Sequence, residues 1–417
     1  MIPIFILQTW LFGLLSLGMA GGAIYCGYLW QQRSWTWDPV SQLSVFAPTF
    51  AADQTTLLLA IACVLTVAVL FGGVLVRMLA MLARRKAGNG EQSPQDKPVP
   101  TSEMRLRRPD GSELHVEFHG PEEGVPIVLT HGWGLHSAEW NYLIPELATE
   151  FRIVVWDEPG LGRSTRPANR DYSIENLARD LEAVLATLGD RPAILLGHSI
   201  GGMIILTFCR LFQVTLGERV VGLVLAHTTP TDPVKTTSGA ALYVPLERPV
   251  LMPLMYLTIA LSPIVWVMNW LSYLNGSAHL STMRGSFGGT ETWEEIEFAT
   301  RFQVLASPAV IARGMLGMMR YDAISTLPTI PIPALVVIGD KDSTTKPEAG
   351  EMVRRGIPEC RLERLSPAKH LGLIEHHAAF AEMVRRFART TADGTFQADR
   401  APVASSGKVW RGAPVQE

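Results

Sequence analysis

The stretch Ala193-Ile194-Leu195-Leu196-Gly197-His198-Ser199-Ile200-Gly201-Gly202 decides the fold of this chain. Four apolar residues before Gly197 predict a buried strand, and the apolar run after Gly202 predicts a helix. A Gly-x-Ser-x-Gly turn between a strand and a helix is typical of a nucleophilic serine held in a strained backbone conformation. The flanking glycines let strand and helix approach closely. We therefore predict a nucleophile at Ser199, with an ordinary glycine-rich turn as the alternative.

Length and composition bound the remaining possibilities. The 417 residues exceed the usual size of one domain, so we expect one large domain with appendages. A net charge of −3 gives no reason to expect a nucleic-acid partner. The mean hydropathy of +0.18 is high for a soluble enzyme, and the apolar residues are concentrated in three segments. The four cysteines are far apart and lack metal-site spacing, so we expect buried free thiols: Cys26, Cys63, Cys209 and Cys360.

Two of the apolar segments lie near the N-terminus and predict membrane-spanning helices. Ile4 to Trp30 contains no charged residue and is long enough for one crossing. A cleaved signal peptide is the alternative, but no Lys or Arg precedes this segment and the apolar run is too long. Thr56 to Leu82 forms the second segment, interrupted only by Arg77 near its end. Residues 1–86 are therefore predicted to form a two-helix transmembrane anchor.

The basic residues around the second span predict its orientation. The loop between the spans carries one Arg and two Asp, whereas Arg84, Arg85 and Lys86 follow the second span. Because basic residues gather on the cytoplasmic side, everything after residue 83 is predicted to be cytoplasmic. The protein is thus expected to be a two-pass protein of the inner or plasma membrane, with the lipid bilayer as its partner.

Beyond a polar, Gly- and Pro-rich linker at 87–101, the sequence predicts an α/β domain. Met104 to Arg108 and Leu114 to Phe118 alternate around a turn, which predicts a hairpin. Short apolar runs then alternate with helical stretches such as Ile174 to Leu188, which follows the cap residue Ser173. This order predicts a mostly parallel sheet covered by helices on both faces. The predicted strands are Ile127 to Thr130, Ile153 to Trp156, Ala193 to Leu196, Val220 to Ala226, Ala334 to Ile338 and Cys360 to Leu365.

The loops after these strands should hold the remaining site residues, because ligands bind beyond the carboxyl ends of parallel strands. His131-Gly132-Trp133-Gly134 is a glycine-flanked turn that suits backbone N–H groups aimed at a developing negative charge. We predict an oxyanion hole with donors from Trp133 and Ile200, with an ordinary strand-to-helix turn as the alternative. The loop Asp157 to Ser164 is interpreted as structural.

A carboxylate and a histidine complete the predicted site. Asp342 follows the strand Ala334 to Ile338, where a carboxylate can fix the tautomer of a catalytic histidine. Asp340 and Asp232 remain alternatives, because each also lies close after a predicted strand. His370 lies after the last strand and before the terminal helix. The order Ser199, Asp342, His370 is the chain order of this motif class.

Between residues 104 and 390 the chain resembles the α/β-hydrolase superfamily, in particular lipase- and esterase-like members with a lid after the sixth strand. The resemblance is carried by His131-Gly132, Asp157 with Pro159-Gly160 and Gly162 to Ser164, Gly197 to Gly202, Gly339 with Asp342, and His370. It implies a hydrolase core at 102–229 and 330–390. Superfamily members that open epoxides or remove halogen use an Asp nucleophile, which Ser199 argues against. Lys369 departs from the Gly that many relatives have before the histidine.

The third apolar segment lies within about a hundred residues that separate two strands, too long for a plain connection. We predict a helical lid at 230–329. Its segment Val250 to Leu274 carries no charge. A single crossing there would place neighbouring strands on opposite sides of the membrane, so we expect an interfacial or re-entrant helix pair. The predicted breaks are Pro253 and Pro263, with Trp266, Trp270 and Tyr273 at headgroup depth. A lid buried on its own core is the alternative.

The sequence thus predicts a membrane-anchored serine hydrolase of carboxylic esters with lipophilic acyl chains, such as monoacylglycerol. The catalytic residues would be Ser199, Asp342 and His370. Acyl transfer, thioester hydrolysis and carbon–carbon bond hydrolysis on the same triad remain alternatives. A binding module for a lipid-like ligand is the non-enzyme alternative. No metal or organic cofactor is required, and residues 391–417 are predicted to be a disordered tail.

Overall fold

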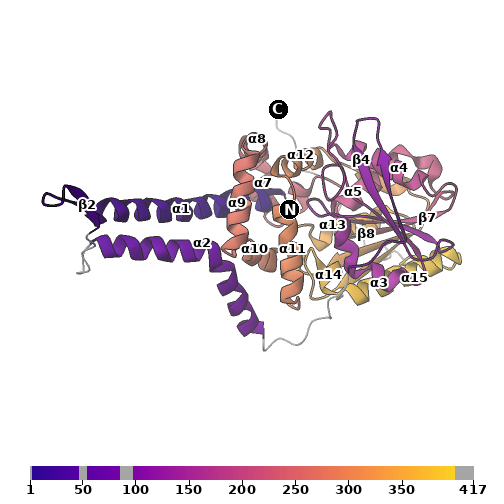
Figure 1. Ribbon diagram of the computed structural model, residues 1–417. Coiled ribbons are helices and arrows are strands. Elements are labelled where there is room, and N and C mark those ends of the chain that lie inside the picture. The colour runs from indigo at the N-terminus through magenta and orange to yellow at the C-terminus, as the bar shows by residue number, and fades with distance from the viewer. Residues whose placement is uncertain (1, 47–53, 85–96, 400–417) are drawn as a thin grey trace.

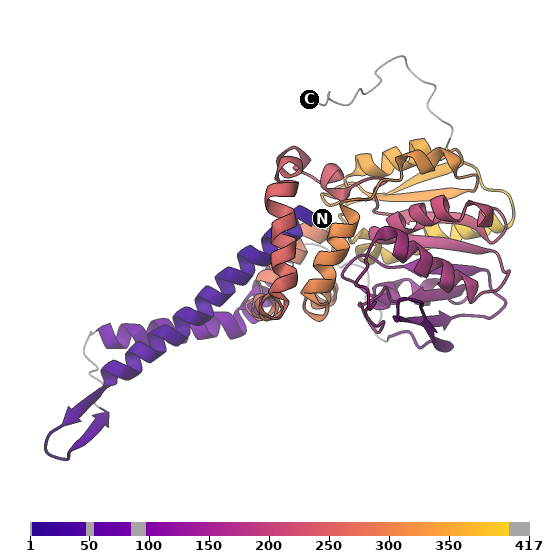
Figure 2. The same cartoon turned by 90° about the horizontal axis from the view of Figure 1, so that it is seen from above.

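The computed structural model describes residues 2–46, 54–84 and 97–399. It consists of a globular part and a long helical hairpin that projects from one side of it (Figures 1 and 2). The hairpin contains the first elements of the chain: α1 (Ile2–Ser34), β1 (Trp35–Asp38), β2 (Leu43–Phe46) and α2 (Gln54–Arg84). Residues 87–96 of the predicted linker lie outside the described residues.

An eight-stranded sheet forms the centre of the globular part, in the order β10-β9-β8-β7-β5-β6-β4-β3. The strands from β5 to β10 are parallel to one another, and β3 and β4 form an antiparallel hairpin at one edge. Each predicted strand is present. The bounds are β3 Ser102–Arg107, β4 Glu113–His119, β5 Pro126–Thr130, β6 Arg152–Trp156, β7 Ala193–His198, β8 Val220–Ala226, β9 Ala334–Gly339 and β10 Cys360–Leu365.

Helices cover both faces of this sheet, which explains why its strands are continuously apolar. Along β5, Ile127 and Leu129 pack against α3 and α15, whereas Val128 between them belongs to the core formed with α4, α5 and α13. Two hydrophobic cores therefore lie on opposite faces of one sheet. The covering helices are α3 Ile144–Leu147, α4 Ile174–Ala186, α5 Ile200–Leu211, α13 Pro347–Gly356, α14 Gly372–Glu375 and α15 His377–Ala392.

A helical insertion between β8 and β9 forms the predicted lid. It contains α6 Pro233–Thr236, α7 Ala240–Leu246, η3 Glu247–Leu251, α8 Met252–Ala260, α9 Ser262–Leu274, α10 Ser277–Ser286, α11 Trp293–Leu305 and α12 Pro308–Met318. The chain bends by 97° between Ala260 and Ser262, just before Pro263, as expected. The predicted break at Pro253 is wrong. Pro253 lies in the first turn of α8, where its missing N–H costs no hydrogen bond, and the π-helical turn η3 joins α7 to α8.

The two hairpin helices are long and apolar enough to cross a membrane, over Phe5–Ser34 and Thr55–Leu82. Both pack against α9 of the lid. This contact depends on small residues. A Cβ on Gly13 would lie 2.8 Å from the Cβ of Met268, and a Cβ on Gly72 would lie 2.6 Å from the carbonyl oxygen of Asn275. The helical hairpin and the insertion between β8 and β9 therefore form one packed unit, whereas the far part of the hairpin has no globular neighbour (Figure 2).

Two further expectations require correction. Cys209 and Cys360 are buried, but Cys26 is only half-buried and Cys63 is exposed, because they lie on α1 and α2 away from the globular part. The predicted disordered tail also begins too early. Helix α15 continues to Ala392, and the Asp399 carboxylate accepts a hydrogen bond from the backbone N–H of Leu362 on the edge strand β10, at 2.8 Å. Residues 400–417 lie outside the described residues.

Candidate active site

Ser199 lies at the turn between β7 and α5, with φ of +55° and ψ of −115°. This conformation is strained for a residue with a side chain and directs the sharp reversal from strand to helix. The neighbouring glycines are needed for steric reasons. A Cβ on Gly197 would lie 2.3 Å from the carbonyl carbon of Gly201, and a Cβ on Gly201 would lie 2.2 Å from the carbonyl oxygen of Thr130. The motif thus encodes the close contact of β7, β5 and α5 that holds Ser199.

The structure brings Ser199, Asp342 and His370 together from three separate loops. The Nε2 atom of His370 is 2.9 Å from the Oγ of Ser199. On the other side of the ring, Nδ1 is 2.9 Å from Oδ2 of Asp342. All three side chains are buried. These contacts have the geometry that a histidine needs to accept the serine proton while a carboxylate orients its ring.

The charge states of His370 and Asp342 follow from their burial and from their contacts. Burial lowers the pKa of His370 to about 4, although Asp342 acts in the opposite direction. Burial alone would raise the pKa of Asp342, but His370 and His227 hold it well below its usual range. The backbone N–H groups of Thr344 and Thr345 also donate to the Asp342 carboxylate, at 2.7 and 3.1 Å. At neutral pH the site therefore contains a neutral imidazole beside an ionised carboxylate.

The two alternative carboxylates have structural positions instead. Asp340 accepts hydrogen bonds from the backbone N–H of Ala368 and the hydroxyl of Ser366, both at 2.8 Å. It thereby ties together the two loops that carry Asp342 and His370. Asp232 caps α6 and accepts from the backbone N–H of Val234 at 2.9 Å. Only Asp342 contacts the ring of His370 among these three carboxylates.

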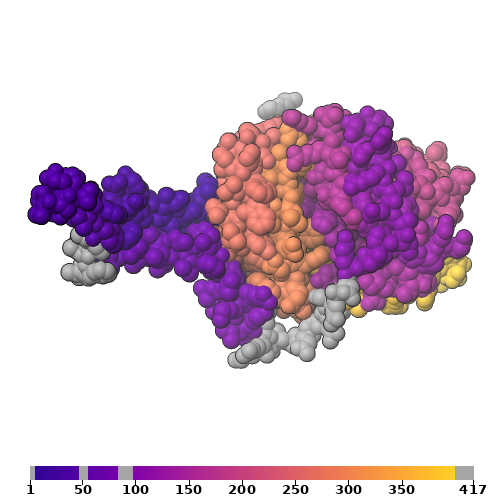
Figure 3. All heavy atoms as spheres, in the orientation of Figure 1, coloured from indigo at the N-terminus to yellow at the C-terminus, as the bar shows by residue number. Residues whose placement is uncertain are grey.

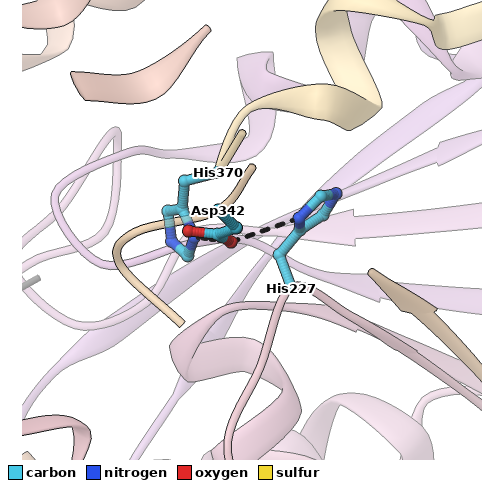
Figure 4. Close-up of side chains that lie close together, drawn as sticks. All are labelled: His227, Asp342 and His370. Carbon is cyan, nitrogen blue, oxygen red and sulfur yellow. Dashed lines mark hydrogen bonds and ion pairs between the residues drawn. The ribbon is translucent and has the colours of Figure 1, made fainter. Parts of the chain in front are cut away.

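His227 is a site residue that sequence reasoning missed. It follows β8 with a φ of +47°, and its Nδ1 atom lies 3.4 Å from the same Oδ2 atom of Asp342 that contacts His370. Figure 4 shows the two imidazoles on opposite sides of the carboxylate. Thr345 donates from its hydroxyl to the backbone carbonyl of His227 and to Asp342, at 2.8 and 2.9 Å. Asp342 is therefore held by two imidazole rings and by hydrogen bonds from its own loop.

The predicted oxyanion donors lie on two segments, the start of α5 directly after Ser199 and the loop after β5. Ile200 is the first residue of α5, so its N–H belongs to the positive end of that helix. Trp133 follows β5, is buried, and donates from its indole Nε1 to the backbone carbonyl of Ile311 in the lid at 2.9 Å. The loop carrying Trp133 is therefore fixed against α12. That both N–H groups stabilise an oxyanion remains a prediction.

A buried network around Glu139 connects the parts of this site, and no sequence motif indicated it. The carboxylate of Glu139 accepts from the backbone N–H of Gly132 at 2.8 Å, and its other oxygen lies 2.5 Å from Nδ1 of His198. His198 in turn donates from Nε2 to the backbone carbonyl of His370 at 3.0 Å. Burial alone would raise the pKa of Glu139, but His198 and Gly132 lower it overall. One ionised carboxylate thus connects the loops that carry Ser199, His370 and Trp133.

The loop Asp157 to Ser164 has the structural role expected for it. The carboxylate of Asp157 accepts from the backbone N–H groups of Ser137 and Arg163, both at 2.7 Å. The hydroxyl of Ser164 donates to the backbone carbonyl of Asp157. The loop thus supports the helical turn that contains Glu139.

A cavity of about 160 Å³ has His370, His198 and Trp133 in its wall. Lid residues from α8 to α12 form much of the remaining wall. The first turns of α1 also contribute, through Phe5, Ile6, Gln8 and Thr9. Sequence reasoning assigned this part of α1 to the membrane span, and no local signal separates the two roles because both need apolar side chains.

Comparison with known proteins agrees with the architecture. Residues 125–248 match the family model for the alpha/beta hydrolase fold, a region that contains Ser199 but ends before Asp342 and His370. A non-heme chloroperoxidase of Streptomyces lividans is 34% identical over 94 residues, which are 22% of this chain and 34% of that protein. A pimeloyl-[acyl-carrier protein] methyl ester esterase of Sodalis glossinidius is 38% identical over 104 residues, 25% of this chain and 37% of the esterase.

Solved structures extend the likeness over the whole globular part. A thermophilic esterase from Thermogutta terrifontis has a TM-score of 0.56 at 25% identity, covering 70% of this chain and 99% of the esterase. The chain spans less than half the length of the two curated relatives, 34% and 37%. Together with the sheet order, these findings establish that the chain has the α/β-hydrolase fold, with a mostly parallel sheet. Its similarity to hydrolases and esterases makes that chemistry the first to consider.

Proposed function

We propose that this protein is a membrane-anchored serine hydrolase that cleaves carboxylic esters with lipophilic acyl chains. The observation that carries the proposal is the continuous chain of contacts from Ser199 through His370 to Asp342, with 2.9 Å at each step. This chain of contacts borders a cavity whose described lining contains no Asp, Glu, Lys or Arg. A nucleophile activated in this way beside an uncharged cavity suits an apolar acyl substrate.

The reaction would proceed in two steps. His370 takes the Ser199 proton on Nε2 while Oγ attacks the ester carbonyl, and the N–H groups of Trp133 and Ile200 stabilise the resulting oxyanion. The carbon–oxygen bond to the alcohol then breaks, and His370 returns the proton to the leaving alcohol. A water molecule deprotonated by His370 attacks the acyl-enzyme, which releases the acid and restores the serine hydroxyl.

The lid and the hairpin support the membrane part of the proposal. Beyond the contact of Ser16 with Asn275, residues 17–30 of α1 carry no charged side chain and would span about 21 Å at 1.5 Å per residue, most of the roughly 30 Å hydrocarbon thickness of a bilayer. The lid forms the face of the globular part from which the hairpin projects (Figure 3). This face exposes apolar side chains, including Leu257, Ile264, Trp266 and Val267. We propose that it rests on the cytoplasmic surface of the membrane, where an apolar substrate can enter directly.

The three aromatic residues assigned to headgroup depth differ in their surroundings. Trp266 is 45% exposed, whereas Trp270 and Tyr273 are half-buried in a row of edge-to-face aromatic contacts. The hydroxyl of Tyr273 donates to Glu297 in α11. Trp266 is therefore the residue of this set best placed to enter the headgroup region.

Labelling with a fluorophosphonate probe tests the proposal in the full-length, detergent-solubilised protein. Replacing Ser199 by Ala should abolish labelling and lower ester turnover by roughly 10³-fold or more without unfolding the chain. Ser102→Ala, a matched change at an exposed position of β3, should leave both unchanged. A series of nitrophenyl esters should show a rate optimum at medium or long acyl chains rather than at acetate.

The other outcomes separate the alternatives. A folded wild-type protein without labelling would contradict the hydrolase proposal and favour a binding module for a lipid-like ligand. Labelling that depends on Ser199 without ester turnover would instead favour acyl transfer or carbon–carbon bond hydrolysis. Labelling that persists in Ser199→Ala would show that another residue is the nucleophile.

A further inference from the structure

The amino-terminal turns of α1 belong to the substrate cavity and not only to the membrane anchor. Ile6 is 1% exposed and lies in the same hydrophobic core as residues of the sheet and of α5. Phe5, Gln8 and Thr9 line the cavity that His370 borders. Figure 2 shows this end of α1 in the globular part, among the lid helices.

Side-chain hydrogen bonds hold this end of α1 in place. The Trp10 indole donates from Nε1 to the hydroxyl of Thr258 in α8 at 2.9 Å. The hydroxyl of Ser281 in α10 donates to Oε1 of Gln8 at 2.8 Å. About two turns further along the helix, Asn275 donates from Nδ2 to the Ser16 hydroxyl at 2.7 Å. Such bonds orient the helix specifically, because apolar packing alone would tolerate a slide or a rotation.

Gln8 lies where this cavity meets a second one. A second cavity of about 40 Å³ adjoins it and shares Gln8, Phe5, Asn269, Ser281 and Gln303 with the first. Neither His370 nor Trp133 lines this second cavity. The two cavities together extend from His370 to residues of α1, α9 and α10, with polar side chains in the lining that they share.

These polar side chains have free hydrogen-bonding capacity. Within the described residues, the Nε2 group of Gln8 donates no hydrogen bond and Oδ1 of Asn269 accepts none. A side-chain amide nitrogen and an amide oxygen together match a hydroxyl, which both accepts and donates. The described linings of both cavities contain no Asp, Glu, Lys or Arg, so a charged group would lose its hydration without gaining an ionic partner.

We infer that α1 forms part of the wall of the substrate site and contributes to substrate specificity, because Gln8 binds an uncharged hydroxyl or amide group of the substrate. This inference rests on the proposed ester hydrolysis at Ser199 and adds the class of substrate: neutral esters with a second hydrogen-bonding group. The group can belong to the alcohol, as in a monoacylglycerol, or to the far end of the acyl chain. In either case the membrane anchor takes part in substrate selection.

The test compares three octanoyl substrates on the full-length protein in lipid nanodiscs. These are methyl octanoate, its ω-hydroxy derivative and monooctanoylglycerol. Gln8→Met keeps the length and helix propensity of the side chain but removes its hydrogen-bonding groups. It should lower kcat/KM about tenfold for at least one hydroxyl-bearing ester relative to methyl octanoate, because one hydrogen bond in a buried site is lost.

Two further variants control for indirect effects. Gln31→Met makes the same change at an exposed position of α1, far from the cavity, and should leave all three ratios unchanged. Ser281→Ala releases the Gln8 amide and should weaken the preference in the same direction as Gln8→Met. The ratio between two substrates on one preparation is insensitive to a partly misfolded fraction, so it stays informative if Gln8→Met is less stable.

The outcomes distinguish this inference from the proposed function. The ester that loses its advantage in Gln8→Met identifies whether the hydroxyl lies on the alcohol or on the acyl chain. If Gln8→Met changes all three esters equally, or none, Gln8 does not contact the substrate and the inference is wrong while the hydrolase proposal stands. If folded wild-type protein hydrolyses none of the esters and takes no fluorophosphonate label, the proposed function itself is wrong.

Discussion

Replacing Glu139 by Gln should impair catalysis although Glu139 is not expected to touch the substrate. Its carboxylate contacts the Gly132 N–H at 2.8 Å and His198 Nδ1 at 2.5 Å. Gly132 directly precedes the predicted oxyanion donor Trp133, and His198 directly precedes Ser199. Glu139 is therefore a positioning residue for both sides of the predicted oxyanion hole.

The size of the effect follows from the contacts that the substitution changes. A glutamine can still accept from Gly132, but the charged contact to His198 is lost. Hydrogen bonds to charged groups contribute about 1.5–3 kcal/mol. A loss of about 2 kcal/mol in the transition state corresponds to about a 30-fold lower kcat, since about 1.4 kcal/mol is tenfold. KM should change little, because Glu139 itself does not line the cavity.

The assay is steady-state hydrolysis of a nitrophenyl ester, normalised to the number of sites that a fluorophosphonate titrates. Glu123→Gln, a matched change on an exposed turn, serves as the control. The rate of fluorophosphonate labelling should fall in parallel with kcat, because phosphonylation develops charge on an oxygen in the same position. A normalised kcat within twofold of the wild type would refute the reasoning, as would a loss confined to KM.

Two further predictions concern the base and the anchor. Burial lowers the pKa of His370 to about 4, so the imidazole stays unprotonated in mild acid. The value of kcat/KM should therefore be constant from about pH 8 to pH 5 and fall only near pH 4. A pH–rate profile with its acid limb near 6.5 would contradict this pKa. Gly13→Val should destabilise the protein by about 1–3 kcal/mol because its side chain would overlap Met268. Gly21→Val on the same helix is the control, because no atom lies within 4 Å of the new Cβ, and its melting temperature should equal that of the wild type. If the two variants have the same melting temperature, the packing argument is wrong.

The predicted elements that matched the structure depend on local patterns. Continuous apolar runs identified the parallel strands because both faces of the sheet are covered. The hairpin before β5 and the start of α4 at Ser173 follow from turn and cap residues within a few positions. The break predicted at Pro253 was wrong for the same reason, because proline is compatible with the first turn of a helix. Whether the chain breaks there depends on the neighbouring turn η3.

The choice among carboxylates shows where local reasoning stopped. Asp232, Asp340 and Asp342 all follow predicted strands, and each makes hydrogen bonds that a short polar side chain commonly makes in a loop. The 2.9 Å contact to His370 distinguishes Asp342, and it joins residues from two different loops. The contact of His227 with the same carboxylate also required the packing of β8 beside β9.

The sequence by itself determined the α/β fold, the strained turn at Ser199, the insertion after β8 and the two apolar helices. These features are properties of contiguous residues, because strand, helix and turn preferences act over a few positions. Only the tertiary structure decided that Glu139 joins three loops of the site and that Gln8 of α1 lines the cavity. Apart from the hydrogen bond between Glu139 and Gly132, seven positions away, these contacts connect residues tens to hundreds of positions apart. A glutamine that faces a cavity and one that faces solvent look alike until the helices that surround them are packed.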